Sequence, residues 1–291
     1  MRVLMIGDVV GGPGLTVLEN RLPQLIREKT ADFVVVNGEN AADGFGMTEP
    51  DLRRILAAGA TAVTSGNHIW EKRDFWPVMD SEERLLRPAN YPANTGAAKT
   101  PGRGYALYRT GCAARYETGA LANTPVPILV INLQGREYMN AIDCPFRCFD
   151  SIYEAECAAA GTENPIILVD FHAESAREKE SLAYYLDGRA SLVGGTHTHV
   201  QTADERILPN GTAYITDLGM TGITGSVIGM DPQVCLDRVS KQIMYRIVPA
   251  GGAADAPNEE KAAHRAEIQG IFAEIDFKTG KALSIQRLSS T

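Results

Sequence analysis

Short apolar runs alternate with segments of helical spacing through the first part of the sequence. Residues 2–6, 33–36 and 61–64 are rich in β-branched and aliphatic side chains, and we predict a buried strand at each. Between them, apolar residues recur every three or four positions over 15–28 and 49–58, which predicts two helices. A chain that alternates strand and helix in this way folds into parallel strands joined by crossover helices. The fold class is therefore expected to be α/β.

The rest of the sequence continues with strands and helices and contains no internal repeat or linker that would divide it. We predict strands at 104–109, 128–133, 166–169, 190–194, 212–216 and 242–248, helices at 73–79, 151–159 and 175–186, loops at 85–104 and 250–263, and a hairpin formed by 268–275 and 282–288. So many strands fit a sandwich of two sheets flanked by helices better than two separate domains. We predict one domain that spans residues 1–291.

The charge and hydropathy of the chain exclude some classes of partner. A net charge of -8 and a pI near 5.2 argue against an extended nucleic-acid-binding surface, which needs a basic face. A small anionic substrate remains compatible, because a metal ion can supply positive charge locally. The sequence begins with a strand pattern rather than a signal peptide, and no apolar run approaches the roughly 20 residues that span a bilayer. We expect a cytoplasmic protein without membrane association, and a homo-oligomer stays open.

The cysteines suggest no disulfide framework, because their number is odd. They are Cys112, Cys144, Cys148, Cys157 and Cys235. The spacing of Cys144 and Cys148 fits either a zinc site or one face of a helix. We favour reduced thiols, since no further thiol lies close in the sequence.

Polar side chains follow the first three predicted strands where each strand ends beside a glycine. They are Asp8, Glu39, Asn40, Asn67 and His68. In an open α/β sheet the carboxyl ends of the parallel strands form the ligand crevice. We therefore expect these side chains to lie at one rim. The alternatives are purely structural: Asp8 would only cap the following helix, and Asn67 would only form a turn.

The histidines follow the same pattern further along the chain. His172 comes after the predicted strand at 166–169, and His197 and His199 lie in the stretch Gly195-Thr196-His197-Thr198-His199. Side chains two residues apart on an extended segment point the same way, so His197 and His199 are expected to face one site. The fifth histidine, His264, lies in a predicted acidic loop and is taken as structural.

This mixture of side chains predicts a metal centre. Carboxylate and amide oxygens combined with imidazoles suit manganese, iron or zinc. The eight groups are too many for one ion, and they fit two ions about 3.5–4 Å apart that share a carboxylate.

The order of these motifs resembles the calcineurin-like metallophosphoesterases, and more narrowly the YmdB family of bacterial phosphodiesterases. The resemblance includes Gly38-Glu39-Asn40, Gly66-Asn67-His68, 170–174, 195–199 and two softer stretches, 87–92 and 226–230. It implies a four-layer αββα sandwich. Most metallophosphoesterases have a histidine where this chain has Val10, and the narrower family is expected to replace it with Asn40.

The resemblance implies a role for each residue. The first ion would be held by Asp8, Glu39, Asn40 and His199, and the second by Glu39, Asn67, His172 and His197, so that Glu39 bridges the two. The ions would be iron or manganese, with zinc or magnesium as alternatives. A metal-bridging hydroxide would attack phosphorus, and His68 would act as the general acid, with substrate orientation as its alternative role. The implied substrates are small phosphodiesters, above all 2′,3′-cyclic nucleotides.

Several interpretations stay open. The same centre could serve a phosphomonoesterase or nucleotidase, or a regulatory protein with weak residual phosphodiesterase activity. The stretch Gly11-Gly12-Pro13-Gly14 is interpreted as a tight turn near the metal rim, with direct phosphate contact as the alternative. Glu174 either orients His172 or only starts the next helix. Residues 219–230 could form a loop over the site.

Overall fold

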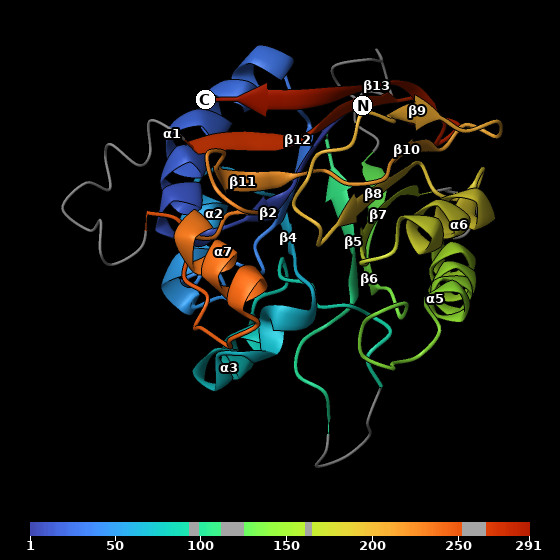
Figure 1. The fold of residues 1–291 in the computed structure, drawn as a ribbon. Coiled ribbons are helices and arrows are strands. Elements are labelled where there is room, and N and C mark those ends of the chain that lie inside the picture. The colour runs from blue at the N-terminus through green and yellow to red at the C-terminus, as the bar shows by residue number, and fades with distance from the viewer. Residues whose placement is uncertain (93–98, 112–124, 161–164, 252–265) are drawn as a thin grey trace.

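Two β-sheets lie face to face in the centre of the protein, with helices on both outer sides (Figure 1). This arrangement is that of a computed structural model, which describes residues 1–92, 99–111, 125–160, 165–251 and 266–291. The α/β sandwich expected from the sequence is confirmed. The predicted loop position of His264 lies outside the described residues.

The first sheet contains the strands from the two ends of the chain. Its strand order is β2-β11-β12-β1-β3-β4, and β13 pairs with β12. The strands are β1 (Arg2–Ile6), β2 (Asp8–Val9), β3 (Phe33–Asn37), β4 (Ala62–Thr64), β11 (Met220–Ile223), β12 (Ala266–Ile275) and β13 (Ala282–Ser290). β1, β3 and β4 are parallel to one another, so their carboxyl ends meet at one edge of the sheet.

The second sheet contains the strands from the middle of the chain, in the order β5-β6-β7-β8-β10-β9. They are β5 (Tyr105–Thr110), β6 (Val126–Gln134), β7 (Ile166–His172), β8 (Leu192–Thr196), β9 (Arg206–Ile207) and β10 (Ala213–Ile215). β6, β7, β8 and β10 are parallel. In the register of β7 and β8, His172 lies beside Thr196.

Helices cover the outer face of each sheet (Figure 1). The first sheet carries α1 (Gly11–Lys29), α2 (Glu49–Ala57) and α3 (Trp76–Ser81), and the second carries α5 (Pro145–Ala160) and α6 (Ala176–Leu186). Two short 3-10 helices, η1 (Asn67–Trp70) and η2 (Arg73–Phe75), follow β4, and α7 (Pro232–Lys241) follows β11.

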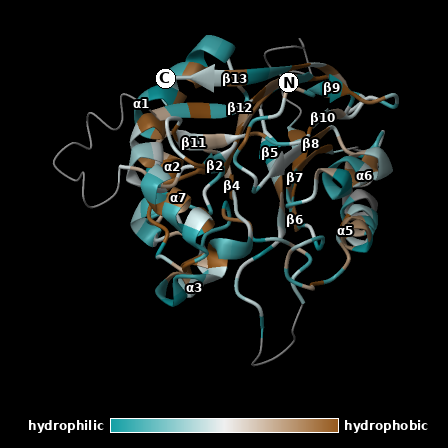
Figure 2. Cartoon of the chain, in the orientation of Figure 1, coloured by the Kyte–Doolittle hydropathy of each residue, from teal (hydrophilic) through white to brown (hydrophobic). Residues whose placement is uncertain are grey.

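Successive side chains of a strand point to opposite faces of the sheet, and this explains why the central strands are apolar throughout. In β1, Leu4 and Ile6 pack against the helices, whereas Val3 and Met5 face the other sheet. Each central strand therefore buries both of its faces, as expected of parallel strands in an α/β protein. Figure 2 shows the same division, with brown apolar segments among the central strands and teal polar stretches on the outer helices.

The region after β11 differs from the expectation in two ways. The stretch 242–248 is not a strand, because Ile243 and Met244 are exposed and no neighbouring strand pairs with this segment among the described residues. β-propensity produces a strand only where a partner is available. The helix α7 before it was missed, although Asp231 caps it and Pro232 begins it, a pairing that favours a helix start.

The glycine-rich stretch after β2 is the first turn of α1 rather than a separate tight turn. A side chain at Gly14 would collide with the carbonyl oxygen of Thr221 in β11. The absence of a Cβ therefore lets the helix begin directly against the sheet. None of the helices in the described part of the chain is both long and apolar enough for a membrane span.

Candidate metal centre

The structure brings together all eight side chains that the sequence placed at the strand ends. Those after β1, β3 and β4 come from the first sheet, and those at the ends of β7 and β8 come from the second. The set is Asp8, Glu39, Asn40, Asn67, His68, His172, His197 and His199. The site therefore lies where the carboxyl ends of the parallel strands of both sheets meet.

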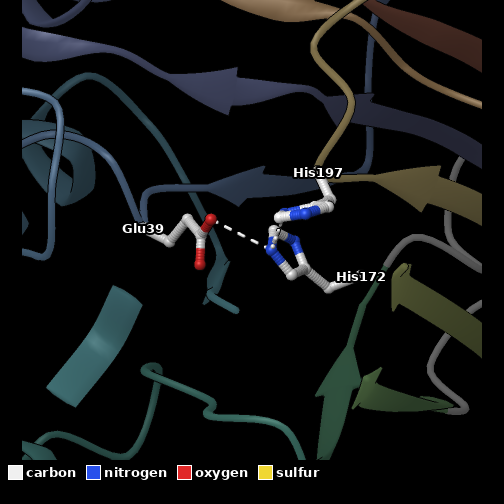
Figure 3. A group of neighbouring side chains, drawn as sticks. All are labelled: Glu39, His172 and His197. Carbon is white, nitrogen blue, oxygen red and sulfur yellow. Dashed lines mark hydrogen bonds and ion pairs between the residues drawn. The ribbon is translucent and has the colours of Figure 1, made fainter. Parts of the chain in front are cut away.

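Glu39, His172 and His197 form the centre of this group (Figure 3). The Nε2 atom of His172 lies 3.0 Å from Glu39 Oε1, 3.0 Å from Asn67 Oδ1 and 3.0 Å from His197 Nδ1. An imidazole nitrogen can donate only one hydrogen, so it cannot satisfy all three neighbours. Convergence of donor atoms around a shared point is what a cation requires.

A second group adjoins the first through Glu39. Asn40 Nδ2 lies 3.1 Å from His199 Nε2 and 3.3 Å from Glu39 Oε1, and His199 Nε2 lies 3.6 Å from Asp8 Oδ2. Asp8 Oδ1 is buried and accepts no hydrogen bond from the described residues. A buried carboxylate oxygen without a partner is costly, and a cation beside it would remove that cost. The two groups, with Glu39 common to both, therefore fit the donor set of two metal ions.

Burial and mutual charge set the protonation of the central pair. Burial raises the pKa of Glu39, but the charge of His172 and its hydrogen bond outweigh this and lower the pKa to about 2. Burial likewise lowers the pKa of His172, but Glu39 outweighs it and raises the pKa to about 9. Without a cation, a buried carboxylate and a buried imidazolium therefore neutralise each other.

The neighbouring groups shift in other directions. Burial, helped by the positive charge of His172, lowers the pKa of His197 to about 3, and burial also lowers the pKa of His199. Both imidazoles are therefore neutral, which is the form that binds a metal. Burial raises the pKa of Asp8 well above its usual range.

A buried hydrogen-bond network orients His172. Its Nδ1 lies 3.0 Å from Thr196 Oγ1, and that hydroxyl donates to Asp170 Oδ1 at 2.7 Å. Asn37 and Thr64 also donate to Asp170. Partners of this kind fix the rotation of a metal-binding imidazole. The sequence assigns no role to Asp170 or Thr196, although both stand at strand ends and within the stretches that carry the family resemblance.

The stretch with His197 and His199 differs from the sequence-based expectation. β8 ends at Thr196, and His197 (φ 95°) and His199 (φ 62°) adopt left-handed backbone conformations. The two imidazoles do line one cavity, but a strained turn places them there, not an extended segment. Backbone strain of this kind persists only where the surroundings hold it.

The surroundings of this turn include a buried ion pair. Lys179 Nζ lies 2.8 Å from Asp217 Oδ2, and the two side chains are 1% and 0% exposed. Thr198, between the two histidines, donates to Asp217 Oδ2 from its hydroxyl at 2.6 Å, and Lys179 donates to that hydroxyl at 3.1 Å. The ion pair thus anchors the turn from behind. Lys179 was not recognised in the sequence, because its helical position alone gives no hint of burial.

Gly66 allows the two sheets to approach at the site. A Cβ at this position would collide with the imidazole of His172 and with Glu39 Oε2. Only glycine therefore fits between β4 and the candidate ligands.

His68 lies next to the candidate ligands but outside their cluster. Its backbone N–H donates to Glu39 Oε2 at 3.2 Å, and its ring packs edge-on against Phe45 with 5.0 Å between centroids. Its Nδ1 is buried, 3.5 Å from Glu71 Oε1. Nε2 is then the ring nitrogen left to meet a substrate.

The remaining sequence-based candidates take other positions. Glu174 Oε2 lies 3.3 Å from His197 Nε2, so it contacts His197 instead of His172, and Ser175 rather than Glu174 caps α6. In the 219–230 segment, the carbonyl oxygen of Ile228 lies 2.8 Å from His199 Nδ1, and Met230 lines the cavity. That cavity has a volume of about 360 Å³.

The cysteines do not contribute to a metal-binding group in the described part of the chain. Cys144, Cys148 and Cys235 are free thiols, and burial raises the pKa of Cys148 to about 11. Cys112 lies outside the described residues.

The chain is similar in sequence and in structure to known proteins. A family model described as YmdB-like protein matches residues 4–288. A Bacillus subtilis protein named 2′,3′-cyclic-nucleotide 2′-phosphodiesterase is 40% identical over 99% of this chain and 96% of its own length. A Thermus thermophilus hypothetical protein has a similar crystal structure, with a TM-score of 0.80, 36% identity and coverage of 99% of this chain and 98% of that one. The crystal structure of a novel phosphatase from Mycoplasma pneumoniae gives a TM-score of 0.81, with 29% identity and coverage of 99% and 92%.

Proposed function

The chain belongs to the YmdB-like family, and from this we propose that it is a metal-dependent phosphodiesterase that hydrolyses 2′,3′-cyclic nucleotides. The observation that carries the proposal is the convergence of Glu39, Asn67 and His197 on one nitrogen of His172, next to the partnerless oxygen of Asp8. The name of the Bacillus subtilis relative, over nearly the whole chain, supplies the substrate class.

We assign seven side chains to two metal ions. One ion is assigned to Asp8, Glu39, Asn40 and His199, and the other to Glu39, Asn67, His172 and His197. Donor sets that mix imidazole with carboxylate and amide oxygens favour iron or manganese, with zinc or magnesium as alternatives. When bound, the pair of cations lowers the pKa of water and offsets the negative charge of the phosphodiester.

The protein's own side chains account for the rest of the reaction. Water attacks phosphorus, the bond from phosphorus to the ribose 2′ oxygen breaks, and a nucleoside 3′-phosphate is released. His68 Nε2 donates the proton that the departing 2′ oxygen needs, a contribution of about 10²–10⁴-fold in rate. The contact with Phe45 holds the ring of His68 in place for that transfer.

A phosphomonoesterase is the second candidate. It is favoured by the Mycoplasma pneumoniae structure, which is described as that of a phosphatase. The same centre can serve both reactions, because both place a phosphate between two cations. The free thiols Cys144, Cys148 and Cys235 fit a reducing compartment, and we keep a cytoplasmic location as part of the proposal.

The test is hydrolysis by the purified full chain reconstituted with Mn²⁺ or Fe²⁺. We expect 2′,3′-cyclic AMP to be converted to adenosine 3′-phosphate, and adenosine 3′-phosphate itself to persist. Chelation before the assay should remove the activity, and added metal should restore it. Turnover that survives chelation, or release of inorganic phosphate from the monoester at a comparable rate, would contradict the proposal.

A further inference from the structure

A second and larger cavity opens from the candidate metal centre. Its volume is about 850 Å³, compared with about 360 Å³ for the cavity at the metal centre. The two cavities share Phe45, His68 and Ile247 in their walls. A volume in the upper part of the range for small-ligand sites, about 300–1,000 Å³, has room for more than one nucleoside.

The position of His68 indicates which part of the substrate enters the larger cavity. In the proposed reaction His68 protonates a ribose oxygen, so the ribose must lie against this residue. The phosphate under attack lies on the metal side of His68. The base and the 5′ end of the nucleoside then extend to the other side, which is the larger cavity. This step rests on the proposed function.

The lining of the larger cavity suits a second phosphate. Lys72, Arg238 and Arg246 contribute three cations, whereas Asp43 and Glu71 contribute two carboxylates. This is one net positive charge within a chain whose overall charge is -8. Arginine and lysine are the usual partners of phosphate in proteins.

The first turn of α1 adds to the same wall, since Gly12 and Pro13 line the cavity. No side chain caps this helix, and its first turn carries no acidic residue. The positive end of the helix dipole is thus presented to the cavity without a neutralising carboxylate of its own. The glycine-rich stretch, for which the sequence left phosphate contact open, is therefore placed where such contact can occur.

The segment after α7 forms one wall of the larger cavity, and a hydrogen bond to α7 holds it in place. Arg238 donates to the carbonyl oxygen of Tyr245 at 3.1 Å. This contact ties the segment that carries Tyr245 and Arg246 to the helix. The aromatic rings of Tyr245 and Phe45 lie in the same lining, where a base can stack on them.

From this combination we propose that the larger cavity binds a phosphate on the 5′ oxygen of the substrate. The preferred substrates would then be 2′,3′-cyclic phosphates that carry a second phosphate, either a 5′-phosphorylated nucleotide or the 3′ end of a short oligoribonucleotide. Both sources place a phosphate on the 5′ oxygen before Lys72 and Arg246, as a monoester in the nucleotide and as a diester in the oligoribonucleotide. Their difference is whether a further nucleoside follows the 5′ phosphate.

The first test compares the values of kcat/KM for three substrates with the Mn²⁺-loaded chain. They are 2′,3′-cyclic AMP, its 5′-phosphorylated form, and a diadenylate that ends in a 2′,3′-cyclic phosphate. We expect the 5′ phosphate to raise kcat/KM about tenfold, mainly through KM. An equal rise for the diadenylate would mean that the site accepts RNA ends, and a rise for the mononucleotide alone would mean that it selects 5′-phosphorylated nucleotides. If neither phosphorylated substrate has a higher kcat/KM than 2′,3′-cyclic AMP, the proposal is overturned.

Matched variants assign the preference to the cavity. Arg246→Gln should reduce the ratio of kcat/KM for 5′-phosphorylated 2′,3′-cyclic AMP to kcat/KM for 2′,3′-cyclic AMP to within about twofold of one. Arg53→Gln removes a charge from the exposed surface of α2, outside the cavity lining, and the ratio should stay at the wild-type value. An unchanged ratio in Arg246→Gln, with the wild-type preference intact, would contradict the assignment.

A binding measurement separates this inference from the proposed function. In the presence of a chelator, adenosine 5′-phosphate should bind about tenfold more tightly than adenosine by calorimetry. Arg246→Gln should abolish the difference. If the chain hydrolyses no cyclic nucleotide but retains this difference, the proposed function fails and the basic phosphate site stands. If the chain hydrolyses 2′,3′-cyclic AMP but shows neither the difference in affinity nor a preference for the 5′ phosphate, the proposed function stands and the phosphate site fails.

Discussion

Glu39 is the side chain on which both halves of the candidate centre depend. One of its oxygens lies 3.0 Å from His172 Nε2 and 3.3 Å from Asn40 Nδ2, and the other accepts the backbone N–H of His68. It is fully buried, so each of these contacts is made away from water. A carboxylate in this position can bridge two cations and also fix the residue proposed as the general acid.

Replacement of Glu39 by glutamine should therefore strongly reduce turnover without unfolding the protein. Loss of a residue that only orients a ligand typically costs about 10–100-fold, and Glu39 belongs to both groups, so we expect kcat/KM to fall by about 10²-fold or more. The measurement is hydrolysis of 2′,3′-cyclic AMP beside a metal titration. Glu83→Gln, which changes an exposed carboxylate, should retain the wild-type rate. A Glu39→Gln protein that keeps both metals and full turnover would argue against a bridging role.

The pairing of Glu39 and His172 makes metal binding depend on pH. The pKa of His172 is raised to about 9, whereas Glu39 (pKa about 2) is ionised and His197 (pKa about 3) is neutral at physiological pH. Below pH 9 a cation must therefore displace one proton from His172, and the apparent affinity falls as the pH falls. The raised pKa of Asp8 acts in the same direction.

Between pH 8.5 and pH 6.5 we expect the affinity for Mn²⁺ to fall by up to about 100-fold, with release of about one proton for each binding event. Calorimetry in buffers of different ionisation enthalpy measures both quantities. An affinity that is constant over this range, with no proton release, would show that metal binding does not remove a proton from His172.

At the scale of the elements, the centre depends on how β8 ends. The strand stops at Thr196, and the next three residues form a turn in which His197 and His199 have positive φ. Lys179 from α6 and Asp217 from the segment after β10 meet behind this turn at Thr198. A strained turn is thus held by two other elements, which is the arrangement expected of a site that must be formed before its ligand arrives.

The hydroxyl of Thr198 should accordingly matter for metal affinity more than for folding. Thr198→Val keeps the shape of the side chain and removes its hydrogen bonds to Asp217 and Lys179. We expect the affinity for Mn²⁺ to weaken about tenfold, with a loss of about 1 kcal/mol in the free energy of unfolding.

Thr212→Val provides the control, because its buried hydroxyl donates to Ala190 and accepts from Gly188, away from the site. It should cost a similar free energy of unfolding and leave metal affinity unchanged. Equal effects of the two variants on metal affinity would mean that Thr198 has no positioning role.

The segment 231–248 shows where sequence patterns are weakest at this scale. Its apolar residues include Leu236, Val239 and Ile243, which are 60%, 70% and 52% exposed. A pattern of apolar residues predicts burial only if another element covers it, and the sequence does not say which element that is. The same limit explains why a strand was expected at 242–248 and why α7 was missed.

At the scale of the whole molecule, the sandwich was predictable because each central strand is buried on both faces. Runs such as 33–36 and 166–169 are apolar throughout, and both faces of β3 and β7 pack against other layers. The parallel order then places the polar residues after each strand at one edge. The placement of Asp8 and Glu39 at one edge of the first sheet, and of His172 at the carboxyl end of a strand in the second, therefore follows from local patterns.

The supporting network could not be predicted in the same way. Asp170 and Thr196 meet through the register of β7 and β8, and Lys179 and Asp217 meet where α6 packs on the same sheet. No local pattern encodes either arrangement. The contact of Glu174 with His197, where His172 was expected, has the same cause. Contacts that depend on strand register and on how a helix packs on its sheet are the part of the site that required the structure.

The division of the candidate ligands between the two sheets has a consequence for stability. Asp8, Glu39, Asn40 and Asn67 follow strands of the first sheet, and His172, His197 and His199 follow strands of the second. A cation held by both groups binds the folded state and not the unfolded chain, because the two sets of ligands converge only after the sheets pack. Saturation at about 100 times Kd then stabilises the fold by about 2.7 kcal/mol for each site. For a chain of 291 residues each site then raises the Tm by about 4 °C, and the two sites together by about 9 °C.

This shift should require ligands from both sheets. We expect Mn²⁺ to raise the Tm of the wild-type chain by that amount in a scanning calorimetry experiment, and EDTA to reverse the rise. His172→Ala, in the second sheet, and Asp8→Asn, in the first, should each remove at least half of it, while Glu83→Gln should leave it intact. A metal-dependent rise that persists in either ligand variant would locate the cation within one sheet. A centre confined to one sheet could not use the junction between the two as its binding site, and the assignment of the ligands would have to change.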